Sequence, residues 1–97
     1  MNATLPDGFL RRLAAIPDGA GEGIYRSRRW GVTVTRSADG RRIWLYGEER
    51  GGMGRVSFNL YLTGAGSPLL KPCEMPEQEV TDFILAYEPE APVQPMR

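Results

Sequence analysis

The sequence predicts a small α+β domain, in which an antiparallel meander of three to five strands is flanked by an N-terminal and a C-terminal helix in two layers. Residues 55–63 alternate strictly between apolar and polar or aromatic side chains, as a half-buried strand does. Apolar residues at helical spacing lie near both ends, and an Asp-Gly pair at positions 39 and 40 indicates a hairpin. A chain of 97 residues is long enough for one modest core.

A short amphipathic helix is predicted over residues 6–16. Pro6 suits the first helical position, because the donor that proline lacks has no partner there in any case. The apolar side chains share one face at i, i+4 and i+7: Phe9, Leu13 and Ile16. Pro17 ends the helix.

Residues 18–23, Asp-Gly-Ala-Gly-Glu-Gly, are predicted to be a flexible connector. A glycine-rich phosphate loop is the alternative, but a dinucleotide fingerprint needs a strand before it and a helix after it. Here a helix precedes the glycines and a strand-like segment follows, and no Gly-Lys-Ser/Thr is present. A plain linker is therefore favoured.

Residues 24–37 are predicted to be extended, and a separate strand over 24–29 is left open. A turn at 38–40 leads into a return strand at 41–47. Glycine at position 40 suits this turn because it accepts positive φ without steric cost. On the return strand Ile43 and Leu45 fall on one face, with Arg42, Trp44 and Tyr46 on the other.

Loops are predicted at residues 48–54 and 63–68, with a short edge strand at 68–71. The last helix begins at Pro76, with acids in its first turn, where they favour the positive end of the dipole. Its apolar stripe is expected to cover the apolar sheet face: Val80, Phe83, Ile84 and Tyr87. The first helix buries its own stripe either beside this helix or across the other sheet face.

Residues 1–87 are assigned to the single domain and residues 88–97 to a disordered tail. Prolines at 89, 92 and 95 match the three-residue turn of polyproline II, so a ligand for an aromatic groove is the alternative reading of this tail. The composition favours simple disorder.

The charges balance, with 12 basic and 12 acidic residues, which argues against a general binder of nucleic acid or of membrane surfaces. The first 55 residues are nevertheless basic and the remainder is acidic. Eleven of the basic residues are arginine, a bias that codon composition in a bacterial-type genome can explain. No segment resembles a signal peptide or a membrane span, so a cytoplasmic location and no membrane partner are expected.

Histidine is absent, which removes the usual general base and the usual zinc ligand. Cys73 is the single cysteine, and because unpaired cysteines are mostly buried, a structural role is favoured for it. The acids at 48–49 and 74–82 are expected to be solvated surface. No catalytic residue, metal site or cofactor is predicted.

The most informative feature is the set of polar and aromatic residues that alternate with the apolar ones along the predicted strands. Eight of their side chains are expected together on the second sheet face: Thr33, Thr35, Arg42, Trp44, Tyr46, Ser57, Asn59 and Tyr61. Three interpretations remain for this face. The first helix covers it, or it docks a protein partner or a second copy of the chain, or it stacks the bases of a single-stranded nucleic acid with arginines on phosphate.

The predicted function is a small non-catalytic interaction module that docks a protein, or itself, on this aromatic-polar face. The expected binding residues are Trp44, Tyr46, Tyr61, Arg42 and Asn59. The runner-up is single-stranded nucleic-acid binding through the same face, and a thiol-dependent enzyme using Cys73 comes third.

Overall fold

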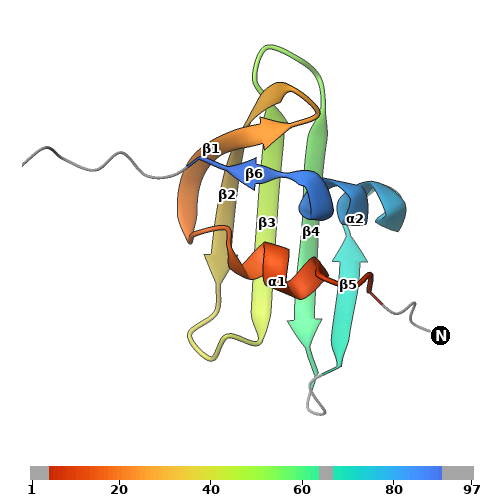
Figure 1. Cartoon of the computed structure of the whole chain (residues 1–97). Coiled ribbons are helices and arrows are strands. Elements are labelled where there is room, and N and C mark those ends of the chain that lie inside the picture. The colour runs from red at the N-terminus through yellow and green to blue at the C-terminus, as the bar shows by residue number, and fades with distance from the viewer. Residues whose placement is uncertain (1–4, 64–66, 91–97) are drawn as a thin grey trace, which may run out of the picture.

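A computed structural model describes residues 5–63 and 67–90 of the chain and confirms a small α+β domain. In chain order the elements are α1 (Phe9–Ala14), β1 (Gly19–Tyr25), β2 (Arg28–Arg36), β3 (Arg42–Glu49), β4 (Arg55–Leu62), β5 (Pro68–Pro72), α2 (Glu77–Ala86) and β6 (Glu88–Pro89). The strands form one antiparallel sheet in the order β5-β4-β3-β2-β1-β6. Both helices lie on the same face of this sheet (Figure 1). The sheet has six strands, which exceeds the predicted three to five.

The glycine-rich residues form most of β1, next to the two-residue edge strand β6, so the prediction of a flexible connector at residues 18–23 is wrong. The glycine-rich segment pairs with β2 along its whole length, from Gly19 opposite Val34 to Tyr25 opposite Arg28. A two-residue turn joins the two strands, with Arg26 at φ 51° and Ser27 at φ 66°. Positive φ at both central residues suits a tight hairpin, but the glycine that usually marks such a turn is missing, so no sequence signal indicated it.

The predicted tail starts with two paired residues. Glu88 and Pro89 form β6 against Ile24 and Gly23 of β1, and the amide of Glu90 donates to the carbonyl of Glu22 at 2.8 Å. Residues 91–97 lie outside the described residues, so the predicted disorder there stays a prediction.

The core lies between the apolar sheet face and the two helices, as the alternation of the strands predicts. Its buried side chains from the sheet are Trp30, Val32, Val34, Ile43, Leu45, Val56, Phe58 and Leu60. The helical side contributes Phe9, Leu13, Ile16, Val80, Phe83, Ile84 and Tyr87. The α1 stripe therefore packs beside α2 and on β4, where the rings of Phe9 and Phe58 lie 6.3 Å apart.

Two arginines hold α1 in this place. The Arg12 guanidinium donates to the carbonyl of Tyr87 at 2.8 Å and so joins the two helical segments. Arg36 of β2 donates to the carbonyls of Leu13 and Ile16, at 3.0 and 2.9 Å, where α1 ends. These contacts fix the end of α1 against the sheet.

Both helices start later than predicted, α1 by three residues and α2 by one. α1 begins at Phe9 rather than at Pro6, because residues 6–8 form a turn in which Gly8 has φ 86° and Phe9 N–H donates to Pro6 at 3.1 Å. α2 begins at Glu77 directly after Pro76, with Glu77 and Glu79 in its first turn as predicted.

Gly23 provides a direct test of the packing between β1 and the residues that follow α2. A Cβ atom there lies 2.3 Å from Tyr87 Cζ and 2.6 Å from the Glu88 carbonyl, so Gly23→Ala is expected to destabilise the fold by about 2 kcal/mol. Gly21→Ala on the same strand is the matched control, because nothing lies within 4 Å of its Cβ. Urea unfolding measures both variants, and equal stability of the two would contradict the packing.

Tyr87 gives the stability of the fold a dependence on alkaline pH. Burial raises the pKa of Tyr87 to about 12, and the charges of Glu22 and Glu90 add to the shift. Because an unfolded tyrosine titrates near pH 10, the unfolded chain loses this proton first as the pH rises. The stabilisation is complete below about pH 10 and decreases by about 2 kcal/mol as the pH approaches 12.

Urea unfolding between pH 9 and pH 12 measures this loss. Tyr87→Phe keeps the ring and removes the titrating hydroxyl, so the stability of this variant should decline less than that of the wild type over the same interval. Parallel pH profiles of the two proteins would show that Tyr87 titrates alike in the folded and unfolded chains.

Candidate interaction face

The second face of the sheet, opposite the helices, carries the predicted binding residues. We call it the open face, and it is formed by Thr33, Thr35, Arg42, Trp44, Tyr46, Ser57, Asn59 and Tyr61 together with the β5 residues Leu69 and Lys71. Neither of the two described helices covers it (Figure 1). Among the described residues, α1 therefore covers the apolar face of the sheet and leaves the open face uncovered.

The register brings the five predicted site residues together. Trp44 of β3 lies opposite Asn59 of β4, and Arg42 lies opposite Tyr61. Tyr46 follows two residues after Trp44, and therefore on the same face. The strands thus place all five in one continuous area, although no contact in the structure tests them as binding residues.

The two central aromatic rings stack on each other along β3. Trp44 and Tyr46 have ring centroids 6.3 Å apart and planes inclined by only 11°. Both side chains are half-buried, although one face of their strand is open, because each ring lies against neighbouring strands. Stacked rings held by a sheet present a large contact area with little side-chain entropy left to lose on binding.

Polar side chains beside the rings contact one another. Arg42 Nη2 donates to Asn59 Oδ1 at 3.4 Å, and Asn59 Nδ2 lies 3.9 Å from Cys73 Sγ. This contact from Arg42 to Asn59 is long and exposed. The planar guanidinium beside Trp44 offers its N–H groups to carboxylate, phosphate or carbonyl oxygens.

Shallow hollows lie on both sides of Tyr46. One of about 310 Å³ lies over β1 and β2, where Ala20, Gly21 and Gly31 leave space. The other, of about 430 Å³, is lined by Ser57 and by Cys73 with its neighbours. The Tyr46 ring therefore separates two recesses, and each is large enough to admit a side chain of a partner.

An ionic network borders the open face at its β1 end. Arg50 lies over Gly31, whose absent side chain makes the room, and pairs with Glu22 at 2.7 Å. Arg29 joins Glu22 and Glu90, each at 3.5 Å. The hydrogen bond from Arg50 is the main cause that lowers the pKa of Glu22, with further contributions from the charges of both arginines. This border is polar and exposed.

Sequence reasoning did not include β5 in this face. Leu69 pairs with Tyr61 and Lys71 with Asn59, so both point to the open side. The run Pro-Leu-Leu-Lys-Pro shows too little alternation to reveal this. The favoured interpretation of Cys73 as a buried structural residue is wrong, since the cysteine is exposed at the end of β5.

Neither a metal centre nor a membrane segment is found in the described parts of the chain. Within residues 5–63 and 67–90, no three Asp, Glu or Cys side chains are grouped to hold a metal ion. Neither α1 nor α2 is long and apolar enough to cross a membrane.

No protein-family model, curated protein or solved structure was found to match this chain.

Fluorescence quenching tests whether the open face is accessible in solution. Trp44 alone, in a Trp30→Phe variant, is expected to emit to the red and to be quenched readily by acrylamide. Trp30 alone, in a Trp44→Phe variant, is only 6% exposed and is expected to emit to the blue and resist quenching. Equal protection of the two indoles in a monomer would contradict an open face.

Proposed function

We propose that this protein is a small non-catalytic interaction module that docks a protein partner, or a second copy of itself, on the open face. The observation that carries the proposal is the stacked Trp44–Tyr46 pair on a sheet face that neither described helix covers. Tryptophan, tyrosine and arginine are the residues that most often provide the binding energy of protein interfaces. All three types meet here.

The arrangement supports a division of roles among the side chains. The Trp44–Tyr46 pair supplies apolar area, and the recesses beside Tyr46 accept side chains of the partner. Arg42, next to Asn59, supplies donors beside the rings. The paired charges of Glu22 and Arg50 form a polar border, as the rim of an interface commonly does.

Single-stranded nucleic acid is the second candidate, and one observation favours it. Arg42, Arg55 and Lys71 lie on the same side of the sheet as the aromatic rings, and none of them forms an ion pair with another described residue. Bases that stack on Trp44 or Tyr46 would bring phosphates within reach of these cations. The zero net charge of the chain weighs against this candidate.

Trp44→Thr is the most informative variant for the protein-docking proposal. Threonine is a good strand residue and already occupies the neighbouring positions on β2, so the fold is expected to persist while the central ring is lost. A central interface tryptophan contributes about 2 kcal/mol or more, so affinity for a captured partner, or for a second copy, should decrease more than about tenfold.

Leu85→Ala serves as the control, because Leu85 is an exposed apolar side chain on α2, on the other side of the molecule. Sedimentation velocity over a concentration series measures self-association, and titration calorimetry measures a partner found by cross-linking. Affinity that survives in Trp44→Thr but is lost in Leu85→Ala would place docking on the helical side and reject the proposal.

The nucleic-acid alternative has its own signature in salt dependence. A single-stranded oligonucleotide titrated at several salt concentrations should bind with log affinity that decreases linearly with log salt if phosphates meet Arg42, Arg55 and Lys71. Lys71→Gln should then make the slope of log affinity against log salt less steep by about one, the contribution of a single phosphate contact. Binding that is absent, or independent of salt, rejects this alternative and leaves protein docking.

A further inference from the structure

The strand register divides the open face into two matching halves. Leu45 of β3 lies opposite Val34 of β2 and opposite Phe58 of β4, so these three residues form one row across the sheet, which we call the central row. All three side chains are buried on the helical side. Because side chains alternate along a strand, the residues directly before and after each of them point to the open side. These neighbours are Thr33, Thr35, Trp44, Tyr46, Ser57 and Asn59.

The two halves carry complementary side chains at equal distances from the central row. On β3, Trp44 precedes the row and Tyr46 follows it, and three positions away lie Arg42 on one side and Glu48 on the other. A two-fold axis along the row reverses the direction of every strand. If two open faces packed about this axis, Trp44 would meet Tyr46 of the second copy, and Arg42 would meet Glu48 of the second copy.

Arg42 and Glu48 are both available for such a contact. Glu48 lies opposite Gly31 and lines the recess over β1 and β2 together with Tyr46, which places it on the open side. Neither Arg42 nor Glu48 forms an ion pair with another described residue. Opposite charges that meet across an interface favour the partner and fix the register.

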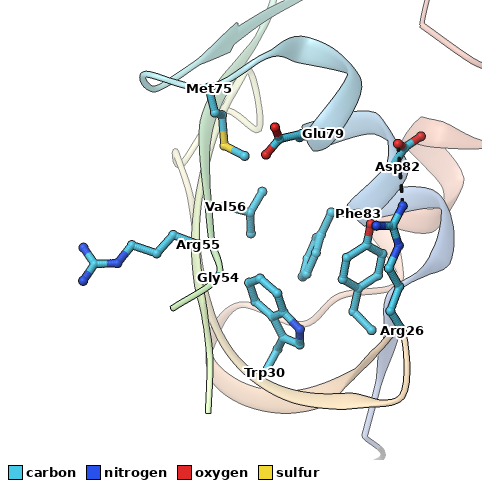
Figure 2. Close-up of a pocket in the computed structure, with 10 residues that line it drawn as sticks. Arg26, Trp30, Gly54, Arg55, Val56, Met75, Glu79, Asp82 and Phe83 are labelled. Atoms are coloured by element: carbon cyan, nitrogen blue, oxygen red, sulfur yellow. Dashed lines mark ion pairs between the residues drawn. The ribbon is translucent and has the colours of Figure 1, made fainter. Parts of the chain in front are cut away.

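Strand β4 repeats the same complementarity. Arg55 and Tyr61 are each three positions from Phe58, so the same axis brings the guanidinium of one copy to the ring of the other. Figure 2, a view of the helical side, shows Arg55 pointing away from Val56 and therefore to the open side of β4. A guanidinium over a tyrosine ring is attracted to its face. Every such contact occurs twice in a two-fold dimer.

The charges also decide between the two ways in which open faces can pack. If the axis ran parallel to β3 instead, Arg42 would meet Arg42 and Glu48 would meet Glu48. Like charges placed opposite each other weaken an interface, so only the axis along the central row is favourable. Packed sheets lie about 10 Å apart with their strands inclined by roughly 30°, a separation that a long arginine and a glutamate can bridge together.

We propose that the open face docks a second copy of this chain, face to face, about a two-fold axis along the central row. This inference rests on the docking function proposed above and specifies its partner. The Trp44 and Tyr46 rings of the two copies form one aromatic cluster at the axis. Two ion pairs between Arg42 and Glu48 close the cluster at both ends of β3. Because the arrangement is closed, assembly ends at the dimer.

Sedimentation velocity over a concentration series measures this assembly. The open face measures about 24 Å in each direction, or roughly 600 Å², which is less than a standard interface buries per partner. The dimer is therefore expected to be weak, and the series extends to millimolar concentration. Trp44 emission, in a Trp30→Phe variant, should move to the blue over the same range as the ring becomes covered.

Two outcomes of the series would overturn the inference. A chain that stays monomeric at millimolar concentration has no such dimer, although docking of a different protein on the open face is then still decided by Trp44→Thr. Species larger than the dimer would show an open, head-to-tail assembly instead of a closed two-fold pair.

Charge reversal identifies the contact. Arg42→Glu and Glu48→Arg each place like charges opposite each other at both ends of β3, so each variant should dimerise more than about tenfold more weakly than the wild type. An equimolar mixture of the two variants should recover a 1:1 dimer, because each end then pairs unlike charges. This recovery separates lost charge pairing from a variant that fails to fold.

Arg11→Glu is the matched control, because Arg11 is an exposed arginine of α1 on the helical side. This variant should dimerise as the wild type does. Equal weakening by all three reversals, or a mixture that stays monomeric, would overturn the proposed dimer. Self-association that is lost in Trp44→Thr but unchanged in the Arg42 and Glu48 reversals would reject the two-fold arrangement and keep the open face as the docking site.

Discussion

The single apolar face of the sheet is the constraint on which the structure depends. Strands β2, β3 and β4 each place their apolar side chains on one side, so both helices must bury their stripes there. They lie beside each other, joined by the hydrogen bond from Arg12 to the Tyr87 carbonyl. Because this layer uses both described helices, the polar and aromatic side of the sheet is left to solvent or to a partner.

The recess beside Tyr46 and Cys73 reaches the start of α2. Met75 and Glu79 line this recess, and the same two residues line a recess on the helical side of the sheet, between α2 and the β1–β2 turn. Met75 is held to β4, where its sulfur accepts the amide N–H of Ser57 at 3.4 Å. The open face is therefore bounded at this end by residues that also pack on the helical side.

The parts of this structure that could be read from the sequence are those with a local repeating pattern. Strict alternation in β4 predicted the core residues and which residues share the second face, although not that this face is left uncovered, and i, i+3, i+4 spacing predicted the buried side of α2. β1 shows no such pattern, because three of its seven residues are glycine, which has no side chain to alternate between an apolar and a polar face. It becomes a strand only through its backbone pairing with β2. The recess beside Tyr46 and Cys73 was beyond prediction for a different reason. It joins residues from β3, β4 and α2, and sequence spacing does not show which distant segments come together.

The glycines of β1 also affect how the sheet moves. Gly19, Gly21 and Gly23 contribute no side chains, so this strand is held by its backbone ladder, by exposed ion pairs and by the ring of Tyr87 above Gly23. Segments with few buried apolar contacts open locally at a lower free energy than the core strands. Ala20, Gly21 and Glu22 of this strand line the recess over β1 and β2. Local opening of β1 would therefore reshape one wall of that recess while the core strands stay folded.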